Sequence, residues 1–149
     1  MRIHRHQAGV MLIEALIGIL IFSIGILALL GMQGAAIKNT TDAKYRSEAS
    51  YLASQIVGQM WVDIANLGSY DTDNMAAYAA RDTWVNNVAQ QLPNVQIGGP
   101  TGPTIQVGPD AGFGLAAQEV RVQVRWQQPG DTDVRQVIIL NRIHAGSGV

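Results

Sequence analysis

An unbroken apolar stretch near the amino terminus constrains this 149-residue chain more than any other feature. Residues 10–32 are hydrophobic, apart from a few small residues and one acidic residue. In an α-helix these 23 residues span roughly 34 Å at about 1.5 Å per residue, which is enough to cross a bilayer. The sequence therefore predicts a membrane-spanning helix.

The acidic residue is Glu14, the fifth residue of the stretch. A carboxylate at the centre of a membrane-spanning helix costs roughly 2.5 kcal/mol or more. A buried charge needs a partner, and the stretch contains no Lys or Arg. A plain membrane anchor gains nothing from this residue, so the default hypothesis is that Glu14 has a function.

A short basic segment precedes the apolar stretch. Residues 1–9 contain Arg2 and Arg5 and no acidic residue. Positive charge on this side predicts a cytoplasmic amino terminus, with the rest of the chain across the membrane. A cleaved secretory signal is the competing interpretation, because the Gly- and Ala-containing residues 31–36 resemble a cleavage site. The apolar run, however, exceeds the roughly 7–15 residues typical of such signals.

The helical pattern continues beyond the apolar stretch. One stripe of apolar residues recurs at intervals of three and four, as in an amphipathic helix. The stripe consists of Tyr45, Ala49, Leu52, Ile56, Met60, Ile64 and Leu67. With Gly68 as a C-terminal stop, the pattern predicts one nearly continuous helix from about residue 11 to residue 67. Residues 39–42 are a weak point, or alternatively a break and N-cap.

The C-terminal half predicts a short helix and an antiparallel sheet. Residues 82–92 suit a helix with Asp82 as N-cap, and the Pro- and Gly-rich residues 93–114 suit a loop. Within that loop one short strand is expected at 104–107. Alternating apolar residues then predict a half-buried strand at 120–126, followed by a turn and a second strand at 134–143. The tail at 145–149 is expected to fray.

The predicted fold class is therefore α+β, with a long N-terminal helix packed on a small antiparallel sheet. The first half of the helix spans the membrane, and the second half packs on the sheet. The sheet is expected to cover the apolar stripe through Val120, Val122, Val124 and Trp126.

These features together resemble type IV pilins and pseudopilins: a basic leader ending in Gly, an apolar run with Glu at its fifth place, a long amphipathic helix and a C-terminal antiparallel sheet. The motif similarity covers residues 2–34. It implies that prepilin peptidase cleaves after Gly9, that Val10 becomes the N-methylated terminus and that Glu14 faces the ammonium of a neighbouring subunit. Val10 departs from the Phe usual at that place.

The resemblance also implies a domain organisation and a location. Residues 1–9 would be the prepilin leader, residues 10–36 the transmembrane and filament-core helix, and residues 37–149 a periplasmic pilin-like domain. The chain would lie in the inner membrane with a cytoplasmic amino terminus and would be incorporated into the pilus.

The implied function is that of a minor pilin that helps to initiate pilus assembly, in a tip complex with other minor pilins. Its partners would be those minor pilins, the major pilin, prepilin peptidase and the inner-membrane assembly platform. Partner contacts are expected on the free helix faces and on the 93–114 loop. The alternatives are a pseudopilin of a type II secretion system and a membrane-anchored minor pilin that captures DNA.

Four arginines of the predicted hairpin are expected to line one sheet face: Arg121, Arg125, Arg135 and Arg142. A solvated face is the simpler interpretation, and a DNA-binding groove is the alternative. Trp61 and Trp84 are expected to pack in the core or between helix and sheet rather than to bind a ligand.

Other chemistry has little support. The chain has no cysteine, which excludes disulfides and thiolate metal sites, and its net charge of -1 gives no general argument for nucleic acid. Neither the pair His4 and His6 nor the group Asp71, Asp73 and Asn74 has the pattern of a metal site. Residues 98–103 lack the Lys of a phosphate-binding loop. We therefore expect no cofactor, no metal and no enzymatic activity.

Overall fold

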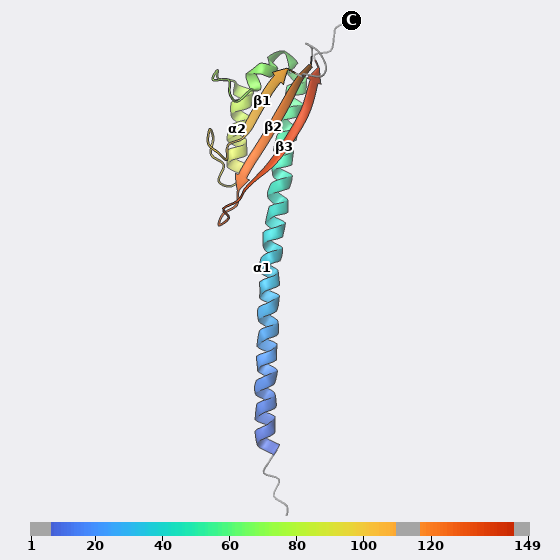
Figure 1. Ribbon diagram of the computed structural model, residues 1–149, viewed down its shortest axis with the longest axis vertical. Helices are drawn as coiled ribbons and strands as arrows, with labels where there is room; N and C mark the ends of the chain where they lie inside the picture. Colours follow the sequence, from blue (N-terminus) through green and yellow to red (C-terminus); the bar gives the residue numbers. More distant parts are fainter. Residues whose placement is uncertain (1–6, 110–116, 145–149) are drawn as a thin grey trace, which may run out of the picture. The chain divides into compact units, whose positions relative to one another are not determined.

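The computed structural model describes residues 7–109 and 117–144. In chain order the elements are α1 (Gln7–Val62), the 3-10 helix η1 (Ile64–Tyr70), α2 (Ala79–Gln91), β1 (Thr104–Pro109), β2 (Ala117–Gln127) and β3 (Val134–His144) (Figure 1). The chain divides into two compact units, residues 1–42 and residues 43–149, and α1 contributes to both. The long N-terminal helix and the small antiparallel sheet confirm the α+β class.

The first unit holds the apolar part of α1. From Val10 to Ile37 every large hydrophobic side chain is between 41% and 74% exposed. Within the described residues, this is the one helix that is long and apolar enough to cross a membrane. Its Ser23 hydroxyl donates to the Ile19 carbonyl at 2.7 Å, which satisfies the hydroxyl without water. By length and composition, the predicted membrane span is therefore present as a helix.

In the second unit, residues 43–62 of α1 bury the predicted apolar stripe. Ala49, Leu52, Ile56 and Met60 are fully buried. They share one core with the inward side chains of β2, which are Val120, Val122, Val124 and Trp126. The prediction that the sheet covers the stripe is confirmed. Burial of this stripe stabilises the helix more than intrinsic propensity does.

The α-helix ends at Val62, five residues before the predicted end. The Asp63 N–H still bonds the Gln59 carbonyl at 3.1 Å, but the chain then tightens into η1, which is kinked at Asn66. The carboxylate of Asp63 accepts a hydrogen bond from the Asn66 side chain at 2.7 Å, which favours the tighter turn. Leu67 remains buried, whereas Gly68 lies inside η1 and is not a helix stop.

The sheet has the order β1-β2-β3 and is antiparallel throughout. Strands β2 and β3 pair antiparallel along their whole length, so the predicted hairpin is confirmed, and alternate side chains of β2 lie in the core. The predicted strand at 104–107 is also present, and it extends to Pro109. Part of the predicted loop (110–114) and the whole C-terminal tail (145–149) lie outside the described residues.

Helix α2 begins at Ala79, three residues before the predicted start. The N-cap residue is Tyr78, and its N–H donates to the Asp82 carboxylate at 3.1 Å. Asp82 therefore caps the helix from within its first turn, and its prediction as the N-cap residue is wrong. The carboxylate acts at the helix N-terminus in either position, where negative charge is favoured. Trp84 and Val88 of this helix are buried in the core.

The segment 93–103 folds tightly against itself, and only glycine fits at position 102 without a shift of the backbone. A Cβ at Gly102 would lie 2.6 Å from the Gln96 carbonyl oxygen. We expect Gly102→Ala to lower the free energy of unfolding by about 1–3 kcal/mol, because backbone must move to admit the methyl group. Denaturant unfolding of the full chain in detergent, followed by the fluorescence of the buried tryptophans, measures this.

Gly58→Ala is the matched control for that substitution. Gly58 lies inside α1, and a Cβ there would meet nothing within 4 Å. The control variant should gain roughly 0.5–1 kcal/mol, because Ala favours helix. Equal effects of the two substitutions would contradict the tight packing of residues 93–103.

Candidate functional site: the amino-terminal part of the apolar helix

Gly9, Val10 and Glu14 lie on consecutive turns of α1. All three are exposed, and Val10 is 66% exposed. Val10 and Glu14 are four residues apart, which places them on one face of the helix, about 6 Å apart along its axis. The peptide bond between Gly9 and Val10 lies in the first turn of the helix, which starts at Gln7. A helix end frays easily, so this bond needs little unwinding to become extended.

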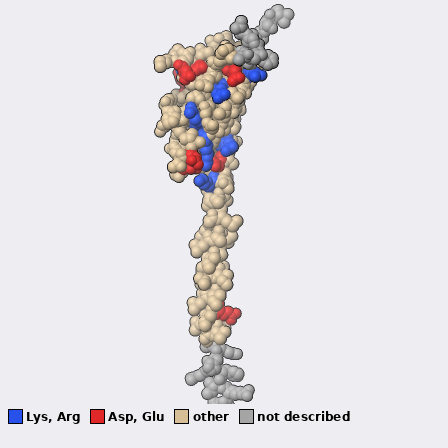
Figure 2. All heavy atoms as spheres, viewed as in Figure 1, with Lys and Arg blue, Asp and Glu red and all other residues tan. Residues whose placement is uncertain are grey.

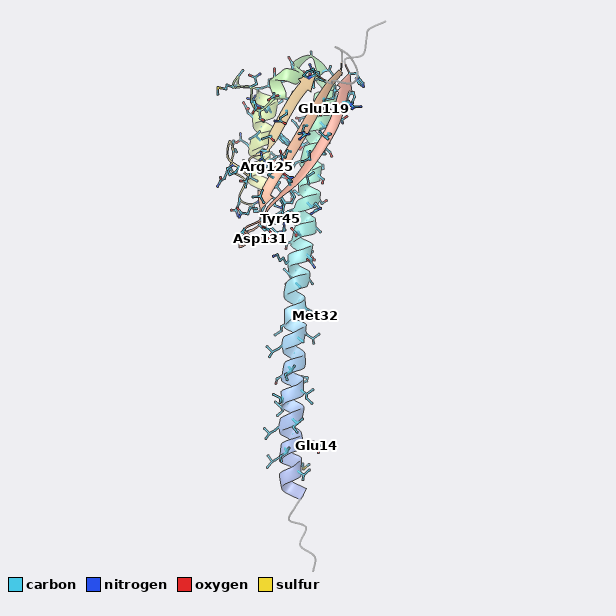
Figure 3. The ribbon with its side chains drawn as sticks, viewed as in Figure 1. Glu14, Met32, Tyr45, Glu119, Arg125 and Asp131 are labelled. Carbon is cyan, nitrogen blue, oxygen red and sulfur yellow. The ribbon has the colours of Figure 1, made fainter. Side chains whose placement is uncertain are left out.

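Glu14 is the one charged residue between Val10 and Ile37. Figure 3 labels Glu14 near the amino-terminal end of α1, and Figure 2 shows a single red patch in that uncharged part of the helix. The next charged residue along the chain is Lys38, which lies roughly 36 Å away along the helix at about 1.5 Å per residue. The described part of the apolar segment therefore holds no cation for a membrane-embedded Glu14, and a second chain or a newly created amino terminus could supply one.

Cleavage after Gly9 would create such a terminus. The new α-amino group of Val10 is a cation, and it would stand about one helical turn from Glu14 on the same face. A charge-assisted pair of ammonium and carboxylate is short and strong where water is excluded. The spacing suits a contact between axially offset subunits, because each helix carries both charges at one end.

The hairpin arginines do not all share a face. Arg121, Arg125 and Arg142 lie on the outer face, whereas Arg135 is paired with Trp126 and lies on the inner face. The Arg135 guanidinium forms an ion pair with Asp131 at 2.9 Å. The prediction of four arginines on one face is wrong, because the pairing register fixes which side of the sheet each residue occupies. Three remain on the outer face, and Arg125 donates to the Gly102 carbonyl at 3.2 Å.

A carboxylate and two tyrosines form a cluster that the sequence did not indicate. Tyr70 donates to Asp63 at 3.2 Å, Tyr78 also donates to it, and the two rings meet edge to face. Hydrogen bonds from Tyr78 and then Asn66 lower the pKa of Asp63 below its usual 3.8. The bond to Asp63 raises the pKa of Tyr78, and burial raises that of Tyr70. The cluster holds the end of α1 beside α2.

Arg81 is a second residue that sequence reasoning missed. It is 7% exposed, and its guanidinium donates to the carbonyls of Asp71, Asn74 and Ala76 at 2.7–2.9 Å. A longer bond reaches the Ser69 carbonyl at 3.4 Å, and Asp82 pairs with its Nε at 2.9 Å. One side chain thereby organises the whole connection between η1 and α2. No local sequence pattern marks this role, because the acceptors are backbone carbonyls.

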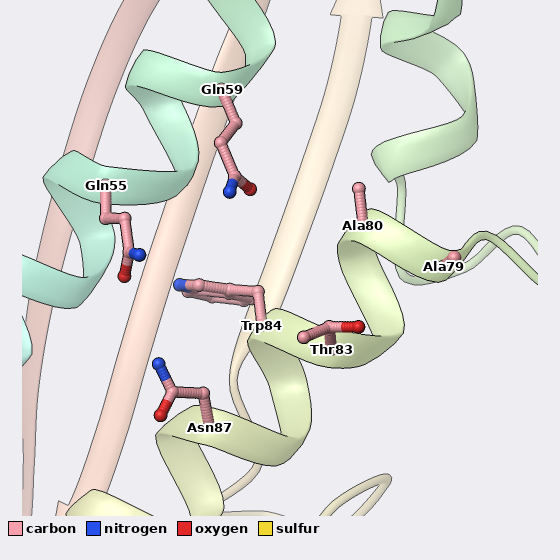
Figure 4. Close-up of a pocket in the computed structure, with 7 residues that line it drawn as sticks. All are labelled: Gln55, Gln59, Ala79, Ala80, Thr83, Trp84 and Asn87. Atoms are coloured by element: carbon pink, nitrogen blue, oxygen red, sulfur yellow. The ribbon is translucent and has the colours of Figure 1, made fainter.

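An open cavity of about 340 Å³ lies between residues 43–62 of α1 and α2. Its polar side chains are those of Gln55, Gln59, Thr83 and Asn87, which surround Trp84 (Figure 4). The indole N–H of Trp84 donates to the Leu52 carbonyl at 2.8 Å, so this ring is structural, as predicted.

Trp61 is 43% exposed, and its prediction as a packing residue is wrong.

The acidic segment after η1 is engaged in structural hydrogen bonds. Asp71 accepts from the N–H groups of Asp73 and Val107 at 2.8 and 2.9 Å. Among residues 7–109 and 117–144 there is no group of three metal-ligating side chains. His4 and His6 lie outside the described residues.

Comparison of the chain with protein-family models, with curated proteins and with solved structures finds no match.

Proposed function

We propose that this chain is a minor type IV pilin that takes part in initiating pilus assembly, in a tip complex with other minor pilins. The single observation that carries the proposal is Glu14. It is the one charged residue between Val10 and Ile37, where α1 is apolar and exposed, and it follows a basic leader ending in Gly. An intramembrane carboxylate without a partner in its own helix is best explained by pairing between subunits.

The finer assignment rests on a local pattern. Residues 22–25 read Phe-Ser-Ile-Gly, and residues 31–33 read Gly-Met-Gln. This combination is most similar to the minor pilin PilV, which is called a type IV pilus modification protein. A pseudopilin of a type II secretion system shares much of the pattern and is the alternative within the same class.

In this proposal the leader at 1–9 stays on the cytoplasmic side of the inner membrane until prepilin peptidase removes it. Val10 is then N-methylated, and Glu14 receives the ammonium of a neighbouring subunit. Residues 10–36 lie in the membrane and later in the filament core, and residues 37–149 form the periplasmic domain. The assembly platform, the major pilin and the other minor pilins are the partners.

The proposal predicts cleavage between Gly9 and Val10, which leaves a mature chain of 140 of the 149 residues. The physical reason is that the bond lies in the first turn of α1, beside the basic segment that stays in the cytoplasm. Intact mass of protein purified from its native membrane measures the outcome. An amino terminus at Met1, or one near Ala36 as for a secretory signal, contradicts the proposal.

DNA capture is a second candidate, favoured by one observation. Arg121, Arg125 and Arg142 share the outer sheet face with Glu119, which gives that face a formal charge of +2. Salt-sensitive retention of DNA that is lost in Arg121→Glu would support it. DNA binding that is unchanged by this substitution, or absent, removes the candidate.

A further inference from the structure

The sulfur chemistry of this chain belongs to methionine alone. The sequence contains five methionines and no cysteine, so no thiol competes with their thioethers for an oxidant. Peroxides oxidise the thioether of methionine to a sulfoxide. The reaction requires contact between the oxidant and the sulfur atom. The exposure of each methionine therefore decides which of them reacts.

The four internal methionines differ widely in exposure. Met60 is fully buried in the core, whereas Met11 and Met32 lie in the apolar part of α1 and are 74% and 71% exposed. Met75 is 101% exposed, more than any other large hydrophobic side chain of residues 7–109 and 117–144. By length and composition the apolar part of α1 can cross a membrane. Lipid or detergent then covers Met11 and Met32, and Met75 is the one of the four that stays in water.

The backbone on both sides of Met75 is held by hydrogen bonds. The Arg81 guanidinium donates to the Asn74 carbonyl at 2.8 Å and to the Ala76 carbonyl at 2.7 Å. The Asn74 side chain accepts the Ala76 N–H at 3.0 Å, as in an Asx turn, and donates to the Gly68 carbonyl at 3.3 Å. None of these bonds uses the Met75 side chain. The turn therefore keeps its shape whatever the oxidation state of the sulfur.

We propose that Met75 is a site of reversible sulfoxidation by peroxides. The sulfur lone pair attacks one oxygen of hydrogen peroxide, and an S–O bond forms while the O–O bond breaks. The released hydroxide takes the proton of the transferred oxygen and becomes water. The sulfur loses two electrons and the peroxide gains them. Because the side chain is fully exposed, its sulfoxide remains in water, and the surface between η1 and α2 changes from apolar to polar while the fold is retained.

An outside reductant reverses the reaction. Methionine sulfoxide reductases supply two thiol groups, which form a disulfide while the sulfoxide oxygen leaves as water. The chain has no thiol of its own, so it cannot carry out this step without such an enzyme. Oxidation creates two epimers at the sulfur, and each epimer has its own reductase. The full exposure of Met75 gives both enzymes access to the sulfoxide.

The test uses the full chain in detergent micelles, treated with hydrogen peroxide and sampled over time. Peptide mass spectrometry measures the rate at which each internal methionine gains one oxygen atom. We expect Met75 to react first, roughly tenfold or more faster than the buried Met60. A rate at Met75 that is equal to or below the rate at Met60, Met11 or Met32 overturns the inference.

Met75→Leu is the matched control, because Leu is of similar size and has no sulfur. This variant should lose the fast phase of oxygen uptake, and the rates at the other methionines should stay unchanged. Wild-type protein oxidised once should keep the tryptophan fluorescence and the denaturation midpoint of untreated protein. A fall in that midpoint, or a fast phase that persists in Met75→Leu, overturns the inference.

Reversal is measured on the same oxidised sample. Methionine sulfoxide reductases A and B, added together with dithiothreitol, should remove the oxygen from Met75 completely, whereas either enzyme alone should remove only part of it. Persistence of the sulfoxide in the presence of both enzymes overturns the inference. Cleavage after Gly9 plays no part in these measurements, so the pilin proposal can fail without affecting them.

Discussion

Glu14→Ala should insert into the membrane at least as well as the wild type but should enter filaments at least tenfold less. A carboxylate at the centre of a membrane helix costs roughly 2.5 kcal/mol or more. Glu14 lies near the start of the stretch, so removing its carboxylate lowers the cost of insertion by less than that. In the proposed filament, however, the Val10 ammonium of a neighbouring subunit would lose its counter-charge, and a loss of about 1.4 kcal/mol already changes an equilibrium tenfold. Quantitative immunoblots of membrane and sheared-filament fractions from a complemented deletion strain measure both effects.

Two variants control for changes in helix packing. Leu16→Ala removes a side chain that is 64% exposed in the same apolar segment and should assemble close to the wild-type level. Glu14→Gln keeps the shape of the side chain and removes its charge, so it should fail as Glu14→Ala does. If Glu14→Ala assembles as well as the wild type, the carboxylate–ammonium pairing is wrong.

Arg81→Met should lower the free energy of unfolding by about 3 kcal/mol. Met retains an unbranched apolar stem, so the main loss is the set of guanidinium bonds to the carbonyls of residues 71, 74 and 76. Buried acceptors without a partner cost about 1–3 kcal/mol each, and solvent can reach some of these in the variant. Denaturant unfolding followed by the fluorescence of Trp84 and Trp126 measures the change.

Arg121→Met is the matched control, because Arg121 is exposed on the outer sheet face. Its effect should stay within about 0.5 kcal/mol. Arg81→Lys keeps the charge but loses the planar guanidinium group with its fixed set of donors. Its free energy of unfolding should lie between those of Arg81→Met and Arg121→Met. A stability of Arg81→Met equal to that of Arg121→Met would contradict the role of Arg81 in organising the connection.

Periodicity alone predicted the largest elements. The apolar stripe from Tyr45 to Leu67 has helical spacing, and the alternation from Val120 to Trp126 has strand spacing. Both patterns are imposed by burial on one side of an element, so both appear directly in the sequence. The same reasoning marked Glu14, because a charge within an apolar run is visible without any tertiary information.

Features set by long-range contacts could not be predicted in this way. The end of α1 at Val62 depends on hydrogen bonds that reach Asp63 from Asn66, Tyr70 and Tyr78. The inner position of Arg135 depends on the register across the hairpin, in which a shift of one residue exchanges the two faces.

The sequence by itself determined that this protein has an apolar, membrane-length helix with one carboxylate, continued by an amphipathic helix and an antiparallel hairpin. Those properties follow from side-chain hydrophobicity and its period along the chain. Only the tertiary structure decided that Arg81 holds the connection before α2 and that Asp71 accepts the N–H of Val107 in β1. Such roles belong to backbone groups, and every residue carries the same backbone donors and acceptors until folding brings particular ones together.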